Sequence, residues 1–223
     1  MIVAIDGPAG VGKSSVCKII AEKCSLFYLN SGNFYRAITY KHLKLNRDPN
    51  DKDLTVETAK NIDMRIEKGI LLVDGKDIEK QLHAPEIDLN SSRISVNPKI
   101  RLIVNDLLRK AAEGQNVICE GRDITTVVFP DADYKFYLDA TAEVRANRRY
   151  QQDKKNVNYK NVLKEINERD EIDKNKPVGA LKIAPNAIFI DTSYLTINEV
   201  CAKVLLAIKW QNNDTYGSGE LNG

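Results

Sequence analysis

Short apolar runs alternate along this chain with segments whose apolar residues recur at helical spacing. Five apolar runs of four or five residues have the character of buried strands, at residues 2–6, 26–29, 116–119, 134–138 and 187–191. The segments between them include a clear amphipathic helix that begins at Pro98 and ends at Gly114. Strands that alternate with helices predict an α/β fold with a doubly wound, five-stranded parallel sheet. Ligands of such sheets bind at the carboxyl ends of the strands.

Residues 63–78 show a different pattern, after a modest helix predicted over residues 55–62. The runs 64–67, 69–73 and 76–78 are typical of short antiparallel strands, with a hairpin turn at Asp74-Gly75. We therefore interpret residues 45–93 as a small lobe of antiparallel strands inserted into one domain. The core of that domain would comprise residues 1–44, 94–149 and 177–211.

Two polar stretches in the C-terminal half are expected to lie at the periphery. Residues 150–176 are predicted to form a helical lid, whose tip at residues 151–158 is too polar to be buried and is expected to move. Residues 212–223 are predicted to be a polar tail.

The first predicted strand leads into a G-x-x-x-x-G-K-S sequence. In a phosphate-binding loop, glycines allow successive backbone N–H groups to surround a polyphosphate, and the dipole of the following helix adds positive potential. Lys13 would contact the β and γ phosphates of a nucleoside triphosphate, and the Ser14 hydroxyl would bind a Mg²⁺ ion that bridges them. A glycine-rich turn before an ordinary helix is the structural alternative. The predicted triphosphate-binding residues are Gly7, Pro8, Ala9, Gly10, Val11, Gly12, Lys13, Ser14 and Ser15.

The net charge is only +2, from 33 basic and 31 acidic residues, so no general nucleic-acid surface is expected. The charge is nevertheless uneven, because residues 145–176 hold ten basic and six acidic residues. This segment is predicted to contact an anionic group, although a solvated helical face remains an alternative. Arginines are concentrated there and near the predicted strand ends, and the planar fork of arginine binds phosphate in two places.

The remaining composition predicts a cytoplasmic protein without a membrane anchor. No apolar run is long enough to span a bilayer, and the chain begins with a strand instead of a secretory signal. The four cysteines lie in apolar helix or strand patterns, without the C-x-x-C spacing of metal sites. We expect them to be buried and reduced.

Three further segments resemble, in chain order, sequences of the bacterial cytidylate kinases. They are N-S-G-N-F-Y-R at 30–36, E-G-R-D-I-T-T-V-V-F-P-D-A at 120–132 and E-R-D-x-x-D at 168–173. With the phosphate-binding loop, the resemblance extends from residue 2 to about residue 210. It implies the fold of a P-loop kinase and the Mg²⁺-dependent transfer of the γ-phosphoryl group of ATP to CMP or dCMP. We expect a monomer whose partners are these small substrates.

The resemblance also implies roles for particular residues. The phosphate of CMP would be held by Ser31, Arg36, Arg122 and Lys176, the cytosine by Ser92, Arg101 and Asp123, and the sugar by Tyr35, Arg169 and Asp173. The residues expected to act on the transferring group are Lys13, Arg122, Arg148 and Arg149, with Arg145 also in the lid over the ATP phosphates. No general base is needed, since the attacking phosphate oxygen is already an anion, and surface or packing roles are expected for His42 and His83.

The sequence departs from the family pattern at several positions. Asn30 and Glu120 stand where the family commonly has aspartate, and Thr125 replaces a glycine. Lys176 stands where the family usually has an arginine, so the chain lacks a bidentate phosphate donor at that position.

Other interpretations stay open on the sequence alone. The acceptor could be UMP, AMP or dTMP, or the chain could be a nucleotide-binding switch of the P-loop class instead of a kinase. Structural roles also stay open for the charged residues, because Arg122 could pair with Asp123 within a loop and Arg169 with Asp173 along a helix.

Overall fold

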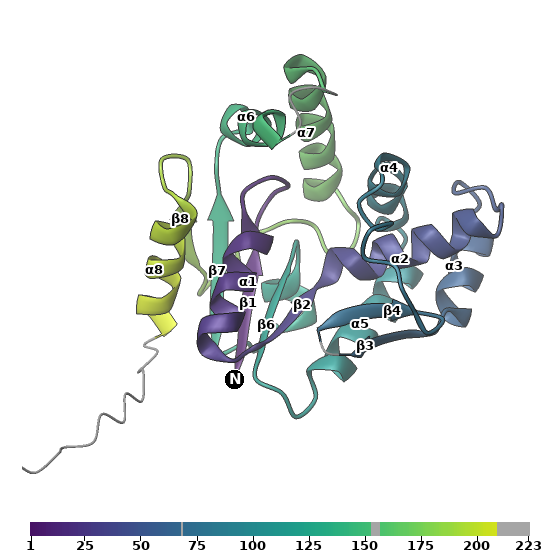
Figure 1. The fold of residues 1–223 in the computed structure, drawn as a ribbon, viewed down its shortest axis with the longest axis horizontal. Coiled ribbons are helices and arrows are strands. Elements are labelled where there is room, and N and C mark those ends of the chain that lie inside the picture. The colour runs from purple at the N-terminus through teal and green to yellow at the C-terminus, as the bar shows by residue number, and fades with distance from the viewer. Residues whose placement is uncertain (68, 153–156, 209–223) are drawn as a thin grey trace, which may run out of the picture.

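A five-stranded parallel sheet lies at the centre of the computed structural model, which describes residues 1–67, 69–152 and 157–208 (Figure 1). The strand order is β2-β6-β1-β7-β8. The strands are β1 (Ile2–Asp6), β2 (Phe27–Asn30), β6 (Val117–Gly121), β7 (Tyr134–Asp139) and β8 (Ile188–Asp191). Each neighbouring pair is parallel, so the predicted sheet is confirmed. Because β1 is the middle strand, the phosphate-binding loop lies at the centre of the carboxyl edge of the sheet.

Helices cover both faces of this sheet. Successive side chains of a strand point to opposite faces, so each strand can contribute to both apolar clusters. In β1, Val3 and Ile5 pack into an apolar cluster with the helices of one face, and Ala4 packs into the cluster of the other face. The helices are α1 (Lys13–Cys24) and α8 (Ile197–Ile208) on the first face, and α2 (Ser31–Lys44) and α5 (Pro98–Ala112) on the second. The sheet is thus doubly wound, as the alternating pattern predicts.

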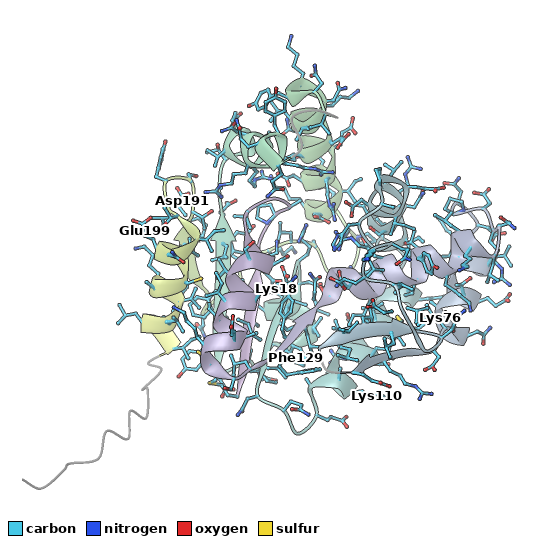
Figure 2. All side chains as sticks on the ribbon, in the orientation of Figure 1. Lys18, Lys76, Lys110, Phe129, Asp191 and Glu199 are labelled. Atoms are coloured by element: carbon cyan, nitrogen blue, oxygen red, sulfur yellow. The ribbon has the colours of Figure 1, made fainter. Side chains whose placement is uncertain are left out.

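A capping box determines where α8 begins. The backbone N–H of Thr196 donates to Oε2 of Glu199 at 2.8 Å, and the N–H of Glu199 donates to Oγ1 of Thr196 at 3.3 Å. These bonds satisfy donors that the start of a helix leaves without partners. Figure 2 shows Glu199 on the first turn of α8.

Three short strands form a separate antiparallel sheet, as the pattern of residues 63–78 predicts. They are β3 (Met64–Glu67), β4 (Ile70–Val73) and β5 (Lys76–Asp77). Asp74 and Gly75 join β4 to β5 with φ angles of 49° and 73°, the left-handed conformation that a tight hairpin turn requires. Leu71 and Val73 belong to the apolar cluster that contains side chains of α2 and α5, so the small sheet packs against the core.

Two further helices, α6 (Ala142–Gln152) and α7 (Tyr159–Lys174), lie above the carboxyl ends of the strands at the top of Figure 1. Ala146, Val162 and Ile166 form an apolar cluster between them. Within the predicted mobile tip, residues 151–152 complete α6 and residues 157–158 precede α7. Residues 153–156 of the tip and the predicted tail lie outside the described residues.

Three elements differ from the sequence-based expectation. The helix α4 (Pro85–Ile94) is not predicted from the sequence. Its apolar pattern is weak, because Asn90 and Ser91 are buried on it while Leu89 is exposed. The helix α3 (Lys52–Asn61) begins before residue 55, because the carboxylate of Asp51 caps it and accepts from the N–H groups of its first turn. A single π-helical turn, Ile124–Val128, follows β6 and has no signature in the apolar pattern.

None of the described helices is both long and apolar enough to cross a membrane. The cysteine prediction is confirmed, because Cys17, Cys24, Cys119 and Cys201 are all buried and free.

Phe136 of β7 is fully buried in the cluster beneath α1 and α8. We expect Phe136→Ala to lower the free energy of unfolding by about 3–5 kcal/mol, because it leaves a cavity in a close-packed core. Phe189→Ala on the neighbouring strand is the matched control, since Phe189 is 51% exposed and should cost less than about 1.5 kcal/mol. Urea unfolding followed by circular dichroism compares the two variants, and equal losses would contradict this assignment of the core.

Candidate active site

A cavity of about 400 Å³ opens at the carboxyl ends of the central strands. Its walls come from the phosphate-binding loop, the ends of β2 and β6, and the helices α2, α4, α5, α6 and α7. The predicted site residues that line it are Ala9, Gly10, Gly12, Lys13, Ser14, Ser15, Ser31, Tyr35, Arg36, Ser92, Arg101, Arg122, Asp123, Arg148, Arg149, Arg169, Asp173 and Lys176. The predicted loop residues Gly7, Pro8 and Val11 do not line it.

The phosphate-binding loop follows β1 directly, and its path depends on glycine. A side-chain carbon at Gly7 would overlap the carbonyl oxygen of Leu138 in β7, so no larger residue fits there. Lys13 is 6% exposed, and its Nζ donates to the carbonyl oxygens of Gly7 at 2.8 Å and Pro8 at 2.9 Å. Burial, together with the positive charge of Arg122, lowers the pKa of Lys13 to about 7. A bound triphosphate would favour the protonated lysine.

Arg145 holds the loop in place and does not line the cavity, so its position differs from the expected one over the ATP phosphates. Its guanidinium is buried and forms a two-bond pair with the carboxylate of Asp170, at 3.1 and 2.6 Å. The same group donates to the carbonyl oxygens of Ala140 at 2.9 Å and Ala9 at 3.1 Å. Arg145 therefore ties the phosphate-binding loop to α6 and α7.

Arg148 and Arg149 extend from α6 into the wall of the cavity. Arg148 donates to the hydroxyl of Thr192 at 3.1 Å and also to its carbonyl oxygen, and the Thr192 hydroxyl lies 3.4 Å from the carbonyl oxygen of Val11 in the phosphate-binding loop. Arg149 is more open, with 40% of its side chain exposed and Glu165 at 3.8 Å. Of the two, Arg149 is the more available to a ligand.

Asp173 is the centre of a cluster of positive charges in the other half of the cavity. Its carboxylate accepts from Nε of Arg122 and from Nζ of Lys176, both at 2.6 Å. Burial raises the pKa of Asp173, but the charges of Arg122 and Lys176 outweigh this effect and hold that pKa well below its usual range. Burial also lowers the pKa of Arg169 to about 10, and the charge of Arg122 adds to this effect. Among the described residues, neither Arg122–Asp123 nor Arg169–Asp173 forms an ion pair, although the charge of Arg169 also lowers the pKa of Asp173.

A second carboxylate and guanidinium, Asp123 and Arg101, form a buried ion pair beside this cluster. Arg101 also donates to the carbonyl oxygen of Ser95 at 3.1 Å, and its guanidinium lies 5.7 Å from the centre of the Tyr35 ring. The backbone of Gly179 packs directly on the pair, where a side-chain carbon would overlap Nη2 of Arg101 and Oδ2 of Asp123. With a φ of 68°, Gly179 also has a backbone conformation that other residues rarely adopt. No sequence motif marks this residue.

Helix α4, which the sequence pattern does not reveal, contributes residues that sequence reasoning missed. Asp88 lines the cavity and accepts from Nε of Arg36 at 2.8 Å. Ser91 of the same helix and Ser95, directly after it, also line the cavity. The polar residues of this segment obscure its helical pattern. The same residues are the signal that could have assigned the segment to the site.

Glu120 and Asn30, near the ends of β6 and β2, contact each other directly. The buried carboxylate of Glu120 accepts from the Tyr28 hydroxyl and from Nδ2 of Asn30 at 3.0 Å. Burial and the Glu120 charge raise the pKa of Tyr28 above its usual range. An aspartate at position 30 would place a second negative charge beside Glu120, whereas asparagine donates a hydrogen bond to it.

Three buried polar atoms of predicted site residues have no hydrogen-bond partner within the described part of the chain. They are Oγ of Ser92, Nε of Arg101 and Nε of Arg169. A buried polar atom without a partner is costly, so atoms of this kind that gather around one cavity indicate a polar ligand.

The two histidines lie elsewhere, as expected. His42 is fully buried and bonds to the Thr58 hydroxyl and the Asp48 carbonyl oxygen, both at 2.9 Å. His83 lines a second cavity of about 370 Å³ beside α1, which Lys18 also lines (Figure 2).

A Mg²⁺ ion fits the donor side of the cavity. Ser14 presents a hydroxyl oxygen there, the hard type of ligand that this ion prefers. Among the described residues no cluster of three or more His, Cys, Asp or Glu could hold a metal, so nucleotide phosphates would supply most of the ligands.

A phosphate-binding loop that faces an arginine-rich pocket across one cavity defines a P-loop kinase. The family model described as Cytidylate kinase matches residues 3–210, and the chain therefore belongs to the cytidylate kinase family. This confirms the predicted family and does not favour the other acceptors or the nucleotide-binding switch.

Individual relatives agree with this assignment. The chain is 42% identical over 210 residues to the cytidylate kinase of Clostridium botulinum (strain Loch Maree / Type A3), which covers 93% of this chain and 97% of that one. It is also 42% identical over 210 residues to the cytidylate kinase of Caldanaerobacter subterraneus subsp. tengcongensis, covering 93% and 94%. A shikimate kinase from Bacteroides thetaiotaomicron superposes with a TM-score of 0.50 at 11% identity, over 94% of this chain and 99% of that one, which supports the fold alone.

The ionised carboxylate of Asp173 is expected to contribute to the free energy of unfolding. We expect Asp173→Asn to lower the free energy of unfolding by about 3–5 kcal/mol at pH 7, because it leaves buried cations without their counter-charge. Since the folded-state pKa lies below the usual 3.8, the stabilisation is fully present above that value and is lost as pH falls.

Urea unfolding of the native protein and the variant between about pH 7 and pH 3 measures this effect. The difference should stay near its full size down to about pH 4 and should shrink as pH falls further. Asp106→Asn is the control, because Asp106 is 67% exposed and lies 3.5 Å from its partner Arg109. A difference that grew with acidity would contradict the assigned charge state.

Proposed function

We propose that this chain transfers the γ-phosphoryl group of ATP to CMP or dCMP. The observation that carries the proposal is one cavity in which the phosphate-binding loop faces two ion-paired clusters, Arg122–Asp173–Lys176 and Arg101–Asp123. The Arg122–Asp173–Lys176 cluster suits the phosphate of an acceptor, and the Arg101–Asp123 pair suits the edge of a base.

The donor half would bind ATP through the residues from Gly7 to Ser15. Lys13 would exchange its present carbonyl partners for the β and γ phosphates, and Ser14 would hold Mg²⁺ through its hydroxyl. When bound, Mg²⁺ neutralises charge that develops on the phosphate oxygens. Arg148 and Arg149 of α6 would add positive charge around the transferring group.

The acceptor half would hold the CMP phosphate through Ser31, Arg36, Arg122 and Lys176, which all line the cavity. The attacking oxygen is already an anion, so the residues must orient two phosphates that repel each other and neutralise them. No proton has to be removed, which agrees with the absence of both histidines from the lining of this cavity.

The paired charges of Arg101 and Asp123 match the edge of cytosine. The exocyclic amino group of cytosine is a donor, and its N3 and O2 atoms are acceptors. Asp123 would accept from the amino group, and Arg101 and Ser92 would donate to the acceptors through the two atoms that lack partners, Nε and Oγ. Tyr35, Arg169 and Asp173 would contact the sugar, and the free Nε of Arg169 supports this assignment.

The surrounding elements suit this reaction. We propose that residues 45–93 form the acceptor-binding insertion and residues 150–176 the lid, because α4, α6 and α7 all contribute lining residues. A closed lid would exclude water that could otherwise hydrolyse ATP. The protein would act in the cytoplasm, where its free thiols would stay reduced, and as a monomer.

A coupled assay with ATP and Mg²⁺ across CMP, dCMP, UMP, AMP and dTMP tests the proposal. We expect the highest kcat/KM values with CMP and dCMP. More efficient phosphorylation of AMP or dTMP would overturn the cytosine assignment. ATP hydrolysis that no monophosphate stimulates would indicate a nucleotide-binding switch instead.

A single substitution tests the acceptor cluster. We expect Arg122→Ala to lower kcat with CMP by about a hundredfold or more, because it removes a preorganised donor to the transferring phosphates. Arg65→Ala is the matched control, since the Arg65 side chain is 68% exposed and does not line the cavity. An unchanged rate in Arg122→Ala would reduce Arg122 to a structural role.

A further inference from the structure

Asp6 is a fully buried carboxylate at the end of β1, directly before the phosphate-binding loop, and no step of the proposed reaction uses it. It accepts three hydrogen bonds from the π-helical turn that follows β6. The backbone N–H of Ile124 donates at 2.9 Å and that of Thr125 at 2.8 Å, and the Thr125 hydroxyl donates at 2.6 Å. Thr125 is 1% exposed, so water does not compete for these bonds.

These bonds join the two halves of the site. Gly7 follows Asp6 in the chain, whereas Arg122 and Asp123 directly precede the residues that donate to it. In the sheet, Asp6 is aligned with Gly121, so the carboxylate reaches across from β1 to the segment that follows β6. The position of Arg122 and Asp123 relative to the phosphate-binding loop therefore depends on this contact.

We propose that Asp6 and Thr125 form a latch that positions the acceptor-binding residues Arg122 and Asp123 against the phosphate-binding loop. The inference rests on the proposed function, because that function assigns the acceptor to these two residues. Asp6 and Thr125 are positioning residues, since neither lines the cavity. The hydroxyl is the specific contribution of this chain, because a glycine at position 125 would donate only through its backbone.

The charge of Asp6 makes the latch sensitive to pH. Burial raises the pKa of Asp6 to about 6, while the hydrogen bonds from Thr125 and Ile124 lower it. The titratable groups around it are Lys13 on α1, Cys119 on β6, Arg122 and Asp123 after β6, and Tyr137 on β7. An ionised carboxylate accepts at both oxygens, whereas the protonated group must donate through one of them. The latch should therefore weaken as pH falls through about 6, and it should weaken at a higher pH without the Thr125 hydroxyl.

Three variants separate the hydroxyl from the backbone contacts. Thr125→Val keeps the shape and the N–H but removes the hydroxyl, and Thr125→Ser restores a hydroxyl. Thr126→Val is the matched control, because the buried Thr126 hydroxyl has no partner within the described residues. If Thr125→Val does not fold, Thr125→Ala takes its place.

We expect Thr125→Val to lower kcat/KM for CMP by about tenfold, the effect of one lost hydrogen bond to a charged group, with KM for ATP within about twofold. Thr125→Ser and Thr126→Val should stay within about twofold of the native protein. The acid limb of the pH profile should move to higher pH in Thr125→Val alone. The phosphate of CMP also titrates near pH 6, but equally for all four proteins, so the difference between them reports on Asp6.

A titration of the Asp6 carboxyl by ¹³C NMR provides a second readout that does not depend on activity. If the native protein phosphorylates CMP and Thr125→Val matches it in KM, pH profile and Asp6 titration, the latch is wrong and the proposed function stands. If no monophosphate is phosphorylated, the proposed function is wrong. In that case, a pKa of Asp6 that is higher in Thr125→Val than in the native protein still supports the Asp6–Thr125 contact as an anchor of the loop. An unchanged pKa of Asp6 overturns the proposed contact.

Discussion

The half of the cavity around Arg122 and Lys176 concentrates positive charge, and the carboxylate of Asp173 makes that concentration stable. Arg122 and Lys176 lie 2.6 Å from its two oxygens, and the buried Arg169 lies on the same helix as Asp173. One carboxylate cannot neutralise all three cations. The pocket therefore keeps an excess of positive charge, which attracts an anionic group.

Hydrogen bonds tie the phosphate-binding loop and the end of β1 to several neighbouring segments. Asp6 holds the segment after β6, Arg145 joins the Ala9 carbonyl to Asp170 of α7, and Thr192 connects Val11 to Arg148. Each tie uses a buried or half-buried polar group with a specific partner, so the geometry is specified more sharply than apolar packing alone would allow.

The sequence was sufficient to predict the five-stranded sheet, because buried strands and amphipathic helices have different apolar periods. It also predicted most of the residues that line the cavity, since their motifs occupy strand ends and parallel strand ends meet at one edge. Which charges pair could not be predicted in this way. Arg122 pairs with Asp173, which is 51 residues away in the sequence, and not with the adjacent Asp123, because pairing follows spatial proximity.

Helix α4 and Gly179 escaped prediction for a related reason. On α4, Asn90 and Ser91 separate the buried Ile87 and Ile94, so the apolar stripe on which sequence reasoning depends is interrupted. Gly179 has no side chain from which a role could be inferred, and only its distance to the Arg101–Asp123 pair reveals its importance. Arg145 shows the opposite error, because an arginine in a basic segment suggested a ligand contact and proved to be a buried brace.

The contact of Gly179 with the Arg101–Asp123 pair also limits how this pocket can diverge. Glycine is already the smallest residue, so every substitution at position 179 brings a side-chain carbon into overlap with Arg101 and Asp123. Such a change would therefore need a compensating change in Arg101, in Asp123 or in the backbone of the segment after α7. The three positions can diverge only together.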